Sequence, residues 1–122
     1  MTTFYKLNYA KPTTISFGGG SIMQVYFSMQ GNAVVVKLVG ELDEHSSHYV
    51  NQQLDKNLIC GGFNAIIFDM SRLTFMDSTG IGLLLTRYKQ LKSCCEMYVK
   101  SPSRTVDKIL NMSGIYQIFK KL

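Results

Sequence analysis

The sequence predicts an α/β fold: a single domain with a mixed sheet of four to five strands and about four helices. Runs rich in β-forming residues alternate with helix-length stretches whose apolar residues recur every three or four positions, in the order β β α β α β α. The first two β-rich runs are separated by a short turn, whereas the later runs are separated by whole helices. We therefore expect the sheet to be antiparallel at its first pair and parallel afterwards, with right-handed crossovers.

The first 22 residues differ from the rest of the chain. They are rich in Thr, Ser, Tyr and Gly, show little periodicity, and close with Gly18-Gly19-Gly20-Ser21, the composition of a flexible linker. We assign residues 1–22 to an N-terminal extension or linker-like segment, part of which could form an edge strand. Residues 23–122 form the predicted domain.

A hairpin opens the domain. Residues 23–29 and 33–40 are rich in β-branched, aromatic and other apolar side chains, which favour strands. Between them, Gln30-Gly31-Asn32 has the composition of a tight turn. The two strands are therefore expected to pair antiparallel.

A helix follows the hairpin. Asp43 is its predicted N-cap, because a carboxylate there accepts backbone N–H groups that have no helical partner. Apolar residues then recur every four positions, and two glycines in succession end the helix. These residues are Val50, Leu54 and Leu58, then Gly61-Gly62.

The second half begins with a strand and a helix. Residues 64–70 are apolar until Asp69, which predicts a central strand buried on both faces. The next helix follows Asp77. Its predicted buried stripe falls at helical spacing and comprises Ile81, Leu84, Leu85, Tyr88 and Leu91.

Three further elements complete the chain. Residues 95–100 alternate enough to predict a strand. Ser101-Pro102 then opens a third helix, which Gly114 ends. Residues 115–119 pack their apolar side chains as a last short element.

Composition excludes several classes of protein. No apolar stretch approaches the ~20 residues of a membrane span, and the first residues lack the pattern of an export signal. The net charge of +5 comes from scattered basic residues, so solvated faces explain it better than nucleic-acid contact. Three cysteines, of which Cys94 and Cys95 are adjacent, are a poor disulfide framework and indicate reduced thiols in a cytoplasmic protein.

The candidate functional site is the stretch from Met76 to Gly82, MDSTGIG. With Asp77 as N-cap, Ser78 occupies the first helical position, where free N–H groups favour an anion. The free N–H groups at the helix N-terminus would stabilise a phosphate esterified to Ser78, whereas the Asp77 carboxylate would repel it. It would also bring roughly −1.5 to −2 charges to a contact surface. Ser78 is therefore a candidate electrostatic off-switch.

The glycines of this helix have two explanations. Gly80 and Gly82 each cost ~1 kcal/mol relative to Ala, and their bare backbone would let a partner come close. The other explanation is that they pack against a strand, and that Asp-Ser-Thr is simply a good helix start. Leu83 and Thr79 lie opposite the predicted buried stripe, so Leu83 is a candidate contact for a partner.

Three segments together resemble the STAS domain, and within that family the bacterial anti-sigma factor antagonists. They are GELD at 40–43, IIFDMSRLTFMDSTGIGLLL at 66–85 and NMSGIYQIF at 111–119, in the family's order and spacing. The resemblance covers residues 23–122. Thr79, where a second serine is common, and Ser93-Cys94-Cys95, where glycines are common, depart from the pattern without touching Ser78.

The resemblance implies a non-enzymatic protein–protein switch without a cofactor or metal. Such a protein binds an anti-sigma factor, which is itself a serine kinase, and so releases a sigma factor. The kinase phosphorylates the serine after the aspartate, here Ser78; the modified form no longer binds, and a phosphatase resets it. Asp43 and the Asp77–Thr79 turn are expected to share the recognition surface. We expect a monomer that contacts neither nucleic acid nor membrane.

Two alternatives stay open. One is a STAS module of another signalling assembly, or a ligand sensor, in which Ser78 is not phosphorylated. The other is a receiver-like switch with Asp69 as phosphoacceptor, although no early acidic pair is present to hold Mg²⁺. A hydrolase centred on Ser78 lacks a nearby base, since His45 and His48 lie on the first helix, and these two histidines are too few for a metal site.

Overall fold

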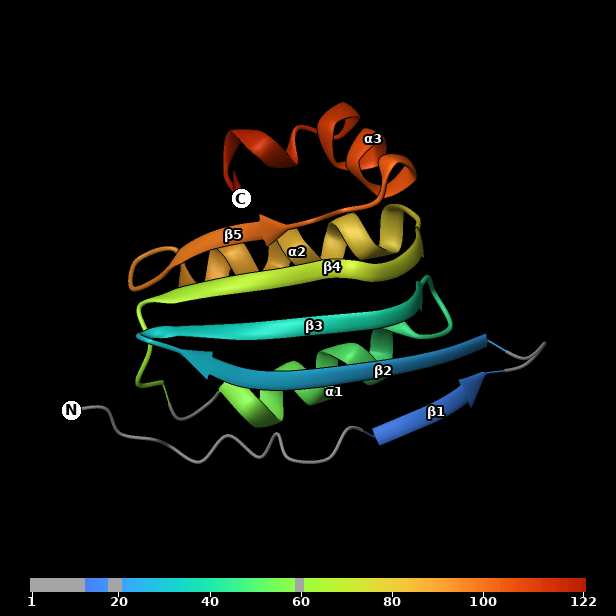
Figure 1. Ribbon diagram of the computed structural model, residues 1–122, viewed down its shortest axis with the longest axis horizontal. Coiled ribbons are helices and arrows are strands. Elements are labelled where there is room, and N and C mark those ends of the chain that lie inside the picture. The colour runs from blue at the N-terminus through green and yellow to red at the C-terminus, as the bar shows by residue number, and fades with distance from the viewer. Residues whose placement is uncertain (1–12, 18–20, 59–60) are drawn as a thin grey trace.

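The computed structural model describes residues 13–17, 21–58 and 61–122, with side chains described from Met23 onward. A six-stranded sheet runs in the order β1-β2-β3-β4-β5-β6 (Figure 1). Its strands are β1 (Thr13–Phe17), β2 (Ser21–Gln30), β3 (Ala33–Leu42), β4 (Ala65–Met76), β5 (Glu96–Lys100) and β6 (Lys120–Lys121). The helices are α1 (Ser47–Leu58), α2 (Ser78–Leu91), α3 (Arg104–Met112) and the 3₁₀ turn η2 (Ile115–Gln117).

The predicted fold class and element order are confirmed. The β1–β2 and β2–β3 pairs are antiparallel, and the β3–β4, β4–β5 and β5–β6 pairs are parallel. The sheet exceeds the predicted four to five strands because β1 adds an edge from within the N-terminal segment and the two-residue β6 adds the other. Gly18–Gly20, the core of the predicted linker, lie outside the described residues.

The sheet buries one face more completely than the other. In β3 and the first half of β4 every second residue is fully buried, for example Val34, Val36, Ile66 and Phe68. The residues between them, such as Ile67, are half-buried. The prediction of a central strand buried on both faces is therefore wrong for β4. Helix α1 connects β3 to β4, and α2 connects β4 to β5. Because both connections have the same hand and the strands are neighbours in order, α1 and α2 lie on the same side of the sheet (Figure 1).

Strand β4 is longer than predicted, since it continues past Met70 to Met76. Its register with β3 shifts just after Asp69, which marks a bulge. There the Asp69 carboxylate accepts the N–H of Ser71 at 3.0 Å, which orders the backbone at the bulge. The added length carries the chain to the end of β3, where the candidate site lies.

The buried face of α2 is also rotated from the predicted stripe. Its buried residues are Gly80, Leu83, Leu84 and Arg87, whereas Leu85 is 37% exposed. The sequence pattern places apolar residues in the core, but here a glycine and an arginine occupy core-facing positions. Gly80 fits because it has no side chain, and Arg87 because α1 supplies polar partners.

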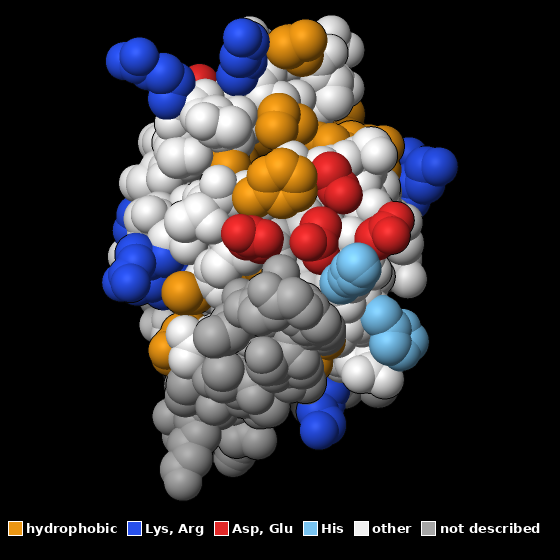
Figure 2. Space-filling view, turned by 90° about the vertical axis from the view of Figure 1, so that its right-hand side faces the viewer, with side chains coloured by type: hydrophobic (Ala, Val, Ile, Leu, Met, Phe, Trp, Pro, Cys, Tyr) orange, Lys and Arg blue, Asp and Glu red, His pale blue; other side chains and the backbone are white. Residues whose placement is uncertain are grey.

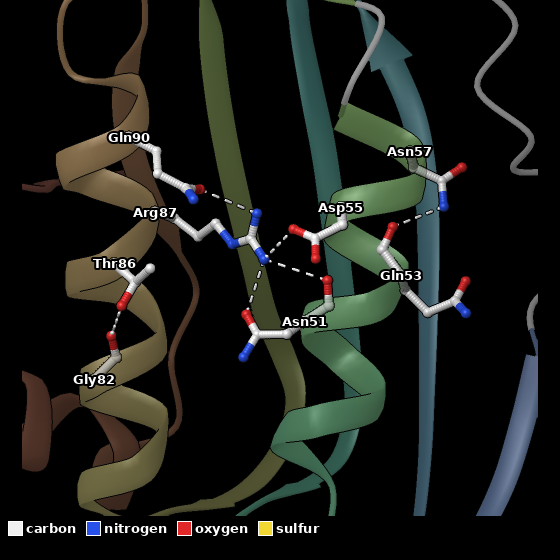
Figure 3. Close-up of polar contacts among 8 residues, drawn as sticks. All are labelled: Asn51, Gln53, Asp55, Asn57, Gly82, Thr86, Arg87 and Gln90. Carbon is white, nitrogen blue, oxygen red and sulfur yellow. Dashed lines mark hydrogen bonds and ion pairs between the residues drawn. The ribbon is translucent and has the colours of Figure 1, made fainter.

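Arg87 joins α2 to α1 (Figure 3). Its Nη2 lies 2.9 Å from Asn51 Oδ1 and 2.8 Å from Asp55 Oδ1, and it also donates to the Asn51 carbonyl oxygen. Nη1 donates to Gln90 within α2. The guanidinium therefore holds the two helices side by side on the sheet.

Candidate functional site

The candidate site lies where two parallel strands end together. Leu42, the last residue of β3, pairs with Met76, the last residue of β4. The Asp77 N–H then donates to the Leu42 carbonyl oxygen at 3.3 Å. Asp43 and Asp77 thus follow neighbouring strand ends, so the tertiary fold brings together the two segments that the sequence separates.

Ser78 begins α2, as predicted, and its side chain is exposed. Asp77 is the N-cap: its Oδ1 accepts the N–H of Thr79 at 2.9 Å, and its carbonyl oxygen accepts the N–H of Gly80 at 3.0 Å. One oxygen of the Asp77 carboxylate therefore binds the backbone of the first turn, which sets Ser78 at the helix entrance.

Asp43 orders the turn before α1 and is not the N-cap of the helix itself. Its Oδ1 accepts the N–H groups of His45 at 2.9 Å and Ser46 at 3.1 Å, whereas α1 begins at Ser47. Ser46 is fully buried and its hydroxyl donates to the Glu41 carbonyl oxygen at 2.7 Å. The helix starts later than predicted because this turn satisfies its own N–H groups first. The Asp-x-x-Ser pattern was the available signal for Ser46.

Gly80 and Gly82 turn out to have different roles. A Cβ on Gly80 would lie 2.6 Å from Met76 Cγ and 3.1 Å from Leu42 Cδ2, so its close approach is to the molecule's own core. The prediction that Gly80 leaves room for a partner is wrong, and the packing explanation holds for it. A Cβ on Gly82 would meet nothing within 4 Å, so this exposed position leaves open backbone on the outside of the helix.

The predicted outward orientation of Leu83 is wrong. Its side chain is only 4% exposed and belongs to the hydrophobic core. The predicted buried stripe followed the larger apolar residues, Leu85 among them. It did not include Gly80 and Arg87, which are buried. Leu83 is therefore not accessible to a partner in this structure.

A groove between α2 and α3 opens beside Ser78. It has a volume of about 380 Å³ and is lined by Met76, Asp77, Ser78, Ile81, Ile109, Met112 and Ser113. Met112 is 77% exposed, although it is a large apolar side chain. The sequence analysis missed the α3 side of this groove. Met112 is the last residue of α3, and its segment carries no local signal that it lies beside α2.

Acidic and apolar side chains surround the helix entrance. Glu41 pairs in register with Phe75, which is 41% exposed. Four of the chain's eight acidic residues belong to the segments that meet here, although the net charge is +5. They are Glu41, Asp43, Glu44 and Asp77. Figure 2 shows acidic and hydrophobic side chains gathered on this face, with both histidines beside them.

Within residues 23–58 and 61–122, no three His, Cys, Asp or Glu side chains are grouped so that they could hold a metal ion. Of the helices that the structure describes, none is long and apolar enough to cross a membrane. At the entrance of α2 the described residues present an exposed hydroxyl, acidic groups and an apolar groove.

A family model described as the STAS domain matches residues 26–122. The chain belongs to the STAS domain family. The family to which the three sequence segments pointed is thereby confirmed, and the order of strands and helices in this STAS domain is the one the sequence predicted.

Known proteins are similar to this STAS domain in sequence and in structure. The anti-sigma F factor antagonist of Paenibacillus polymyxa is 34% identical over 97 residues, which are 79% of this chain and 83% of that relative. Among solved structures, the anti-sigma factor antagonist SpoIIAA in its unphosphorylated form matches with a TM-score of 0.68 and 31% identity, covering 80% of this chain and 87% of that one. The Bacillus cell fate determinant SpoIIAA in its phosphorylated form matches with a TM-score of 0.61 and 30% identity, covering 80% and 90%.

Proposed function

We propose that this STAS domain is an anti-sigma factor antagonist whose binding is switched off by phosphorylation of Ser78. The Paenibacillus relative carries the name of that function, and SpoIIAA exists in phosphorylated and unphosphorylated forms. The observation that carries the proposal is the exposed Ser78 side chain at the first position of α2. A kinase can reach a hydroxyl in that place without unfolding the domain.

The proposed contact surface, which we call the switch face, surrounds that hydroxyl. It comprises Asp43, Asp77, Ser78, Thr79 and Gly82 together with the groove beside α3. Exposed Met112 in the groove supplies apolar area, as does Phe75 two residues before Asp77, and burying this area against a partner stabilises the complex. The acidic side chains around them suit a partner with a basic rim.

A phosphate on Ser78 opposes this contact in two ways. It adds roughly −1.5 to −2 charges to a face that already carries acidic side chains, so a basic partner would need to neutralise more charge. It also places a strongly hydrated group at the mouth of an apolar groove lined by Ile81 and Met112. Closing the interface would then require the phosphate to lose water without a dedicated partner.

The remaining parts of the proposal concern the partners. The anti-sigma factor is the serine kinase that phosphorylates Ser78, and its capture by the unmodified domain releases a sigma factor. A phosphatase restores the hydroxyl. The domain itself acts as a monomeric cytoplasmic binding protein and catalyses no reaction.

The test is incubation with the candidate anti-sigma factor, ATP and Mg²⁺, followed by peptide mass spectrometry and a binding assay. We expect one phosphate on Ser78 and loss of the complex after modification. In the binding assay, Ser93→Asp is the matched control for Ser78→Asp. Ser93 is exposed beyond the other end of α2, so Ser93→Asp should bind normally. Phosphate on Asp69 would favour the receiver-like alternative. No phosphate on any residue would favour a STAS module that works without this switch.

A further inference from the structure

Cys94 and Cys95 form a pair of neighbouring thiols in the turn between α2 and β5. Their sulfur atoms lie 3.8 Å apart, within contact of each other. Both backbone N–H groups donate to the Leu91 carbonyl oxygen, at 3.0 and 2.8 Å, so the turn is held at the end of the helix. Both cysteines are free thiols in this arrangement.

The two thiols have different surroundings. Cys94 is exposed, whereas Cys95 is buried, with 8% of its surface accessible, and its sulfur lies 3.8 Å from the Phe63 carbonyl oxygen. Burial, and then the contact with Cys94, raise the pKa of Cys95 to about 12. Cys95 therefore keeps its proton at neutral pH, and Cys94 is the thiol that an oxidant in solution reaches first.

We propose that Cys94 and Cys95 are a modification site that a hydroperoxide converts into a reversible vicinal disulfide. In the first step the Cys94 thiolate attacks a peroxide oxygen: an S–O bond forms, the O–O bond breaks, and the Cys94 thiol and one hydrogen peroxide become a sulfenic acid and one water. In the second step the Cys95 sulfur attacks the Cys94 sulfur: the S–S bond forms, the S–O bond breaks, and the oxygen leaves as a second water with the Cys95 proton. Two thiols are oxidised and one peroxide is reduced to two waters.

The contact between the two sulfur atoms brings them within reach of a bond, and the backbone makes that bond strained. The sulfur atoms must approach from 3.8 Å to ~2.05 Å, a change that side-chain rotation and a small turn adjustment supply. Consecutive Cα atoms are ~3.8 Å apart, which is below the ~4.4–6.8 Å of ordinary disulfides. The bond is therefore strained, and strained, accessible disulfides are the easily reduced ones. A small dithiol reductant should restore both thiols.

This site is separate from the switch face. Helix α2 has 14 residues, so at ~1.5 Å per residue about 20 Å of helix separates Ser78 from the cysteine turn. Oxidation would pull the Cys95 sulfur from its place near Phe63 and change the entry to β5. Phosphorylation of Ser78 should proceed alike in both redox forms, so failure of one proposal leaves the other standing.

The test uses the full chain carrying Cys60→Ser, which removes the third cysteine as an alternative partner. After treatment with hydrogen peroxide, we expect intact-mass spectrometry to show the loss of two hydrogen atoms, and peptide mapping to place the link within the segment 93–100. A dithiol reductant should restore the original mass. A chain that loses two hydrogens only when Cys60 is present, or that gains oxygen at Cys94 without forming the link, would overturn the proposal.

Two single variants test the order of the steps. Cys95→Ser leaves Cys94 without its partner, so Cys94 should progress to the sulfinic acid with a gain of two oxygen atoms. In Cys94→Ser, the buried Cys95 should remain a thiol under the same peroxide treatment. Oxidation of Cys95 at the rate seen for Cys94 would contradict the proposed attack by Cys94. Far-UV circular dichroism checks that both serine variants keep the fold.

Discussion

The Asp77 N–H donates to the carbonyl oxygen of Leu42 at 3.3 Å, so the last residue of β3 is bonded to the residue that caps α2. Asp43 follows Leu42 in the chain, and Ser78 follows Asp77. One backbone hydrogen bond therefore keeps the turn before α1 beside the entrance of α2. The switch face is therefore built on the ends of two paired strands.

Replacing Ser78 by Asp should weaken binding of the anti-sigma factor by roughly 10-fold or more, since it adds a permanent negative charge beside Asp77. Ser78→Ala should bind like the parent, because the hydroxyl makes no contact that the fold requires. Isothermal titration calorimetry with both variants measures this difference. Equal affinity of Ser78→Asp and Ser78→Ala would rule out an electrostatic switch at this position.

Gly80→Ala and Gly82→Ala should change stability in opposite directions. The new Cβ at Gly80 would lie 2.6 Å from Met76 Cγ, so we expect a loss of roughly 1–3 kcal/mol from overpacking. At Gly82 the Cβ meets nothing within 4 Å, and the gain in helix propensity should stabilise the fold by about 0.5–1 kcal/mol. Urea denaturation measures both.

The same Gly82→Ala variant also tests the switch face. If a partner approaches the open backbone at Gly82, the methyl group should weaken binding while the free domain becomes more stable. Binding that is unchanged in the stabilised variant would exclude Gly82 from the contact surface.

Asp43→Asn should separate charge from structure. The Asn side-chain oxygen can still accept the N–H groups of His45 and Ser46, so the turn should remain and stability should change little. The lost charge should slow association with a basic partner and reduce its dependence on salt, which stopped-flow binding at two ionic strengths measures. Asp43→Ala, which also removes the acceptor of the His45 and Ser46 N–H groups, should in addition destabilise the fold by ~1 kcal/mol.

Arg87→Ala should destabilise the domain by roughly 1–3 kcal/mol, because it leaves the side chain of Asn51 and the groups around it without their donor. The ion pair itself contributes modestly, since the Asp55 carboxylate is 68% exposed. Lys89→Ala is the control, because Lys89 is exposed two residues further along α2. Equal denaturation midpoints for the two variants would show that the Arg87 contacts add nothing to stability.

The contribution of Asp107 should depend on pH. Lys121 lies 2.8 Å from the Asp107 carboxylate, and bonds from Lys121 and then Tyr116 hold the pKa of Asp107 below its usual value of 3.8. A depressed folded-state pKa stabilises the fold above the unfolded-state pKa, and this contribution is lost as the pH falls through the folded value. The difference in melting temperature between the parent and Asp107→Asn should therefore be present at pH 7 and shrink below about pH 4. A difference that is the same at both pH values would contradict this assignment.

Much of the site could be predicted because its signals are local. An aspartate one residue before a helix accepts free N–H groups of the first turn through local contacts, so Asp77 and the first helical position of Ser78 followed from a few residues. The Asp43 cap was placed too early, since a buried serine three residues later, Ser46, completes a turn of its own. The groove residue Met112 was missed because nothing in its own segment says that α3 ends beside α2.

The sequence by itself determined the family, the order of strands and helices, the antiparallel start of the sheet and the serine at the helix entrance. These follow from short-range patterns: apolar periodicity, turn residues and helix caps. Only the tertiary structure decided which way α2 faces, and with it that Leu83 and Gly80 belong to the core while Gly82 is open to solvent. The physical reason is that packing and polar partners on neighbouring elements decide the orientation of α2: Gly80 fits closely against Leu42 and Met76, and Arg87 bonds to Asn51 on α1.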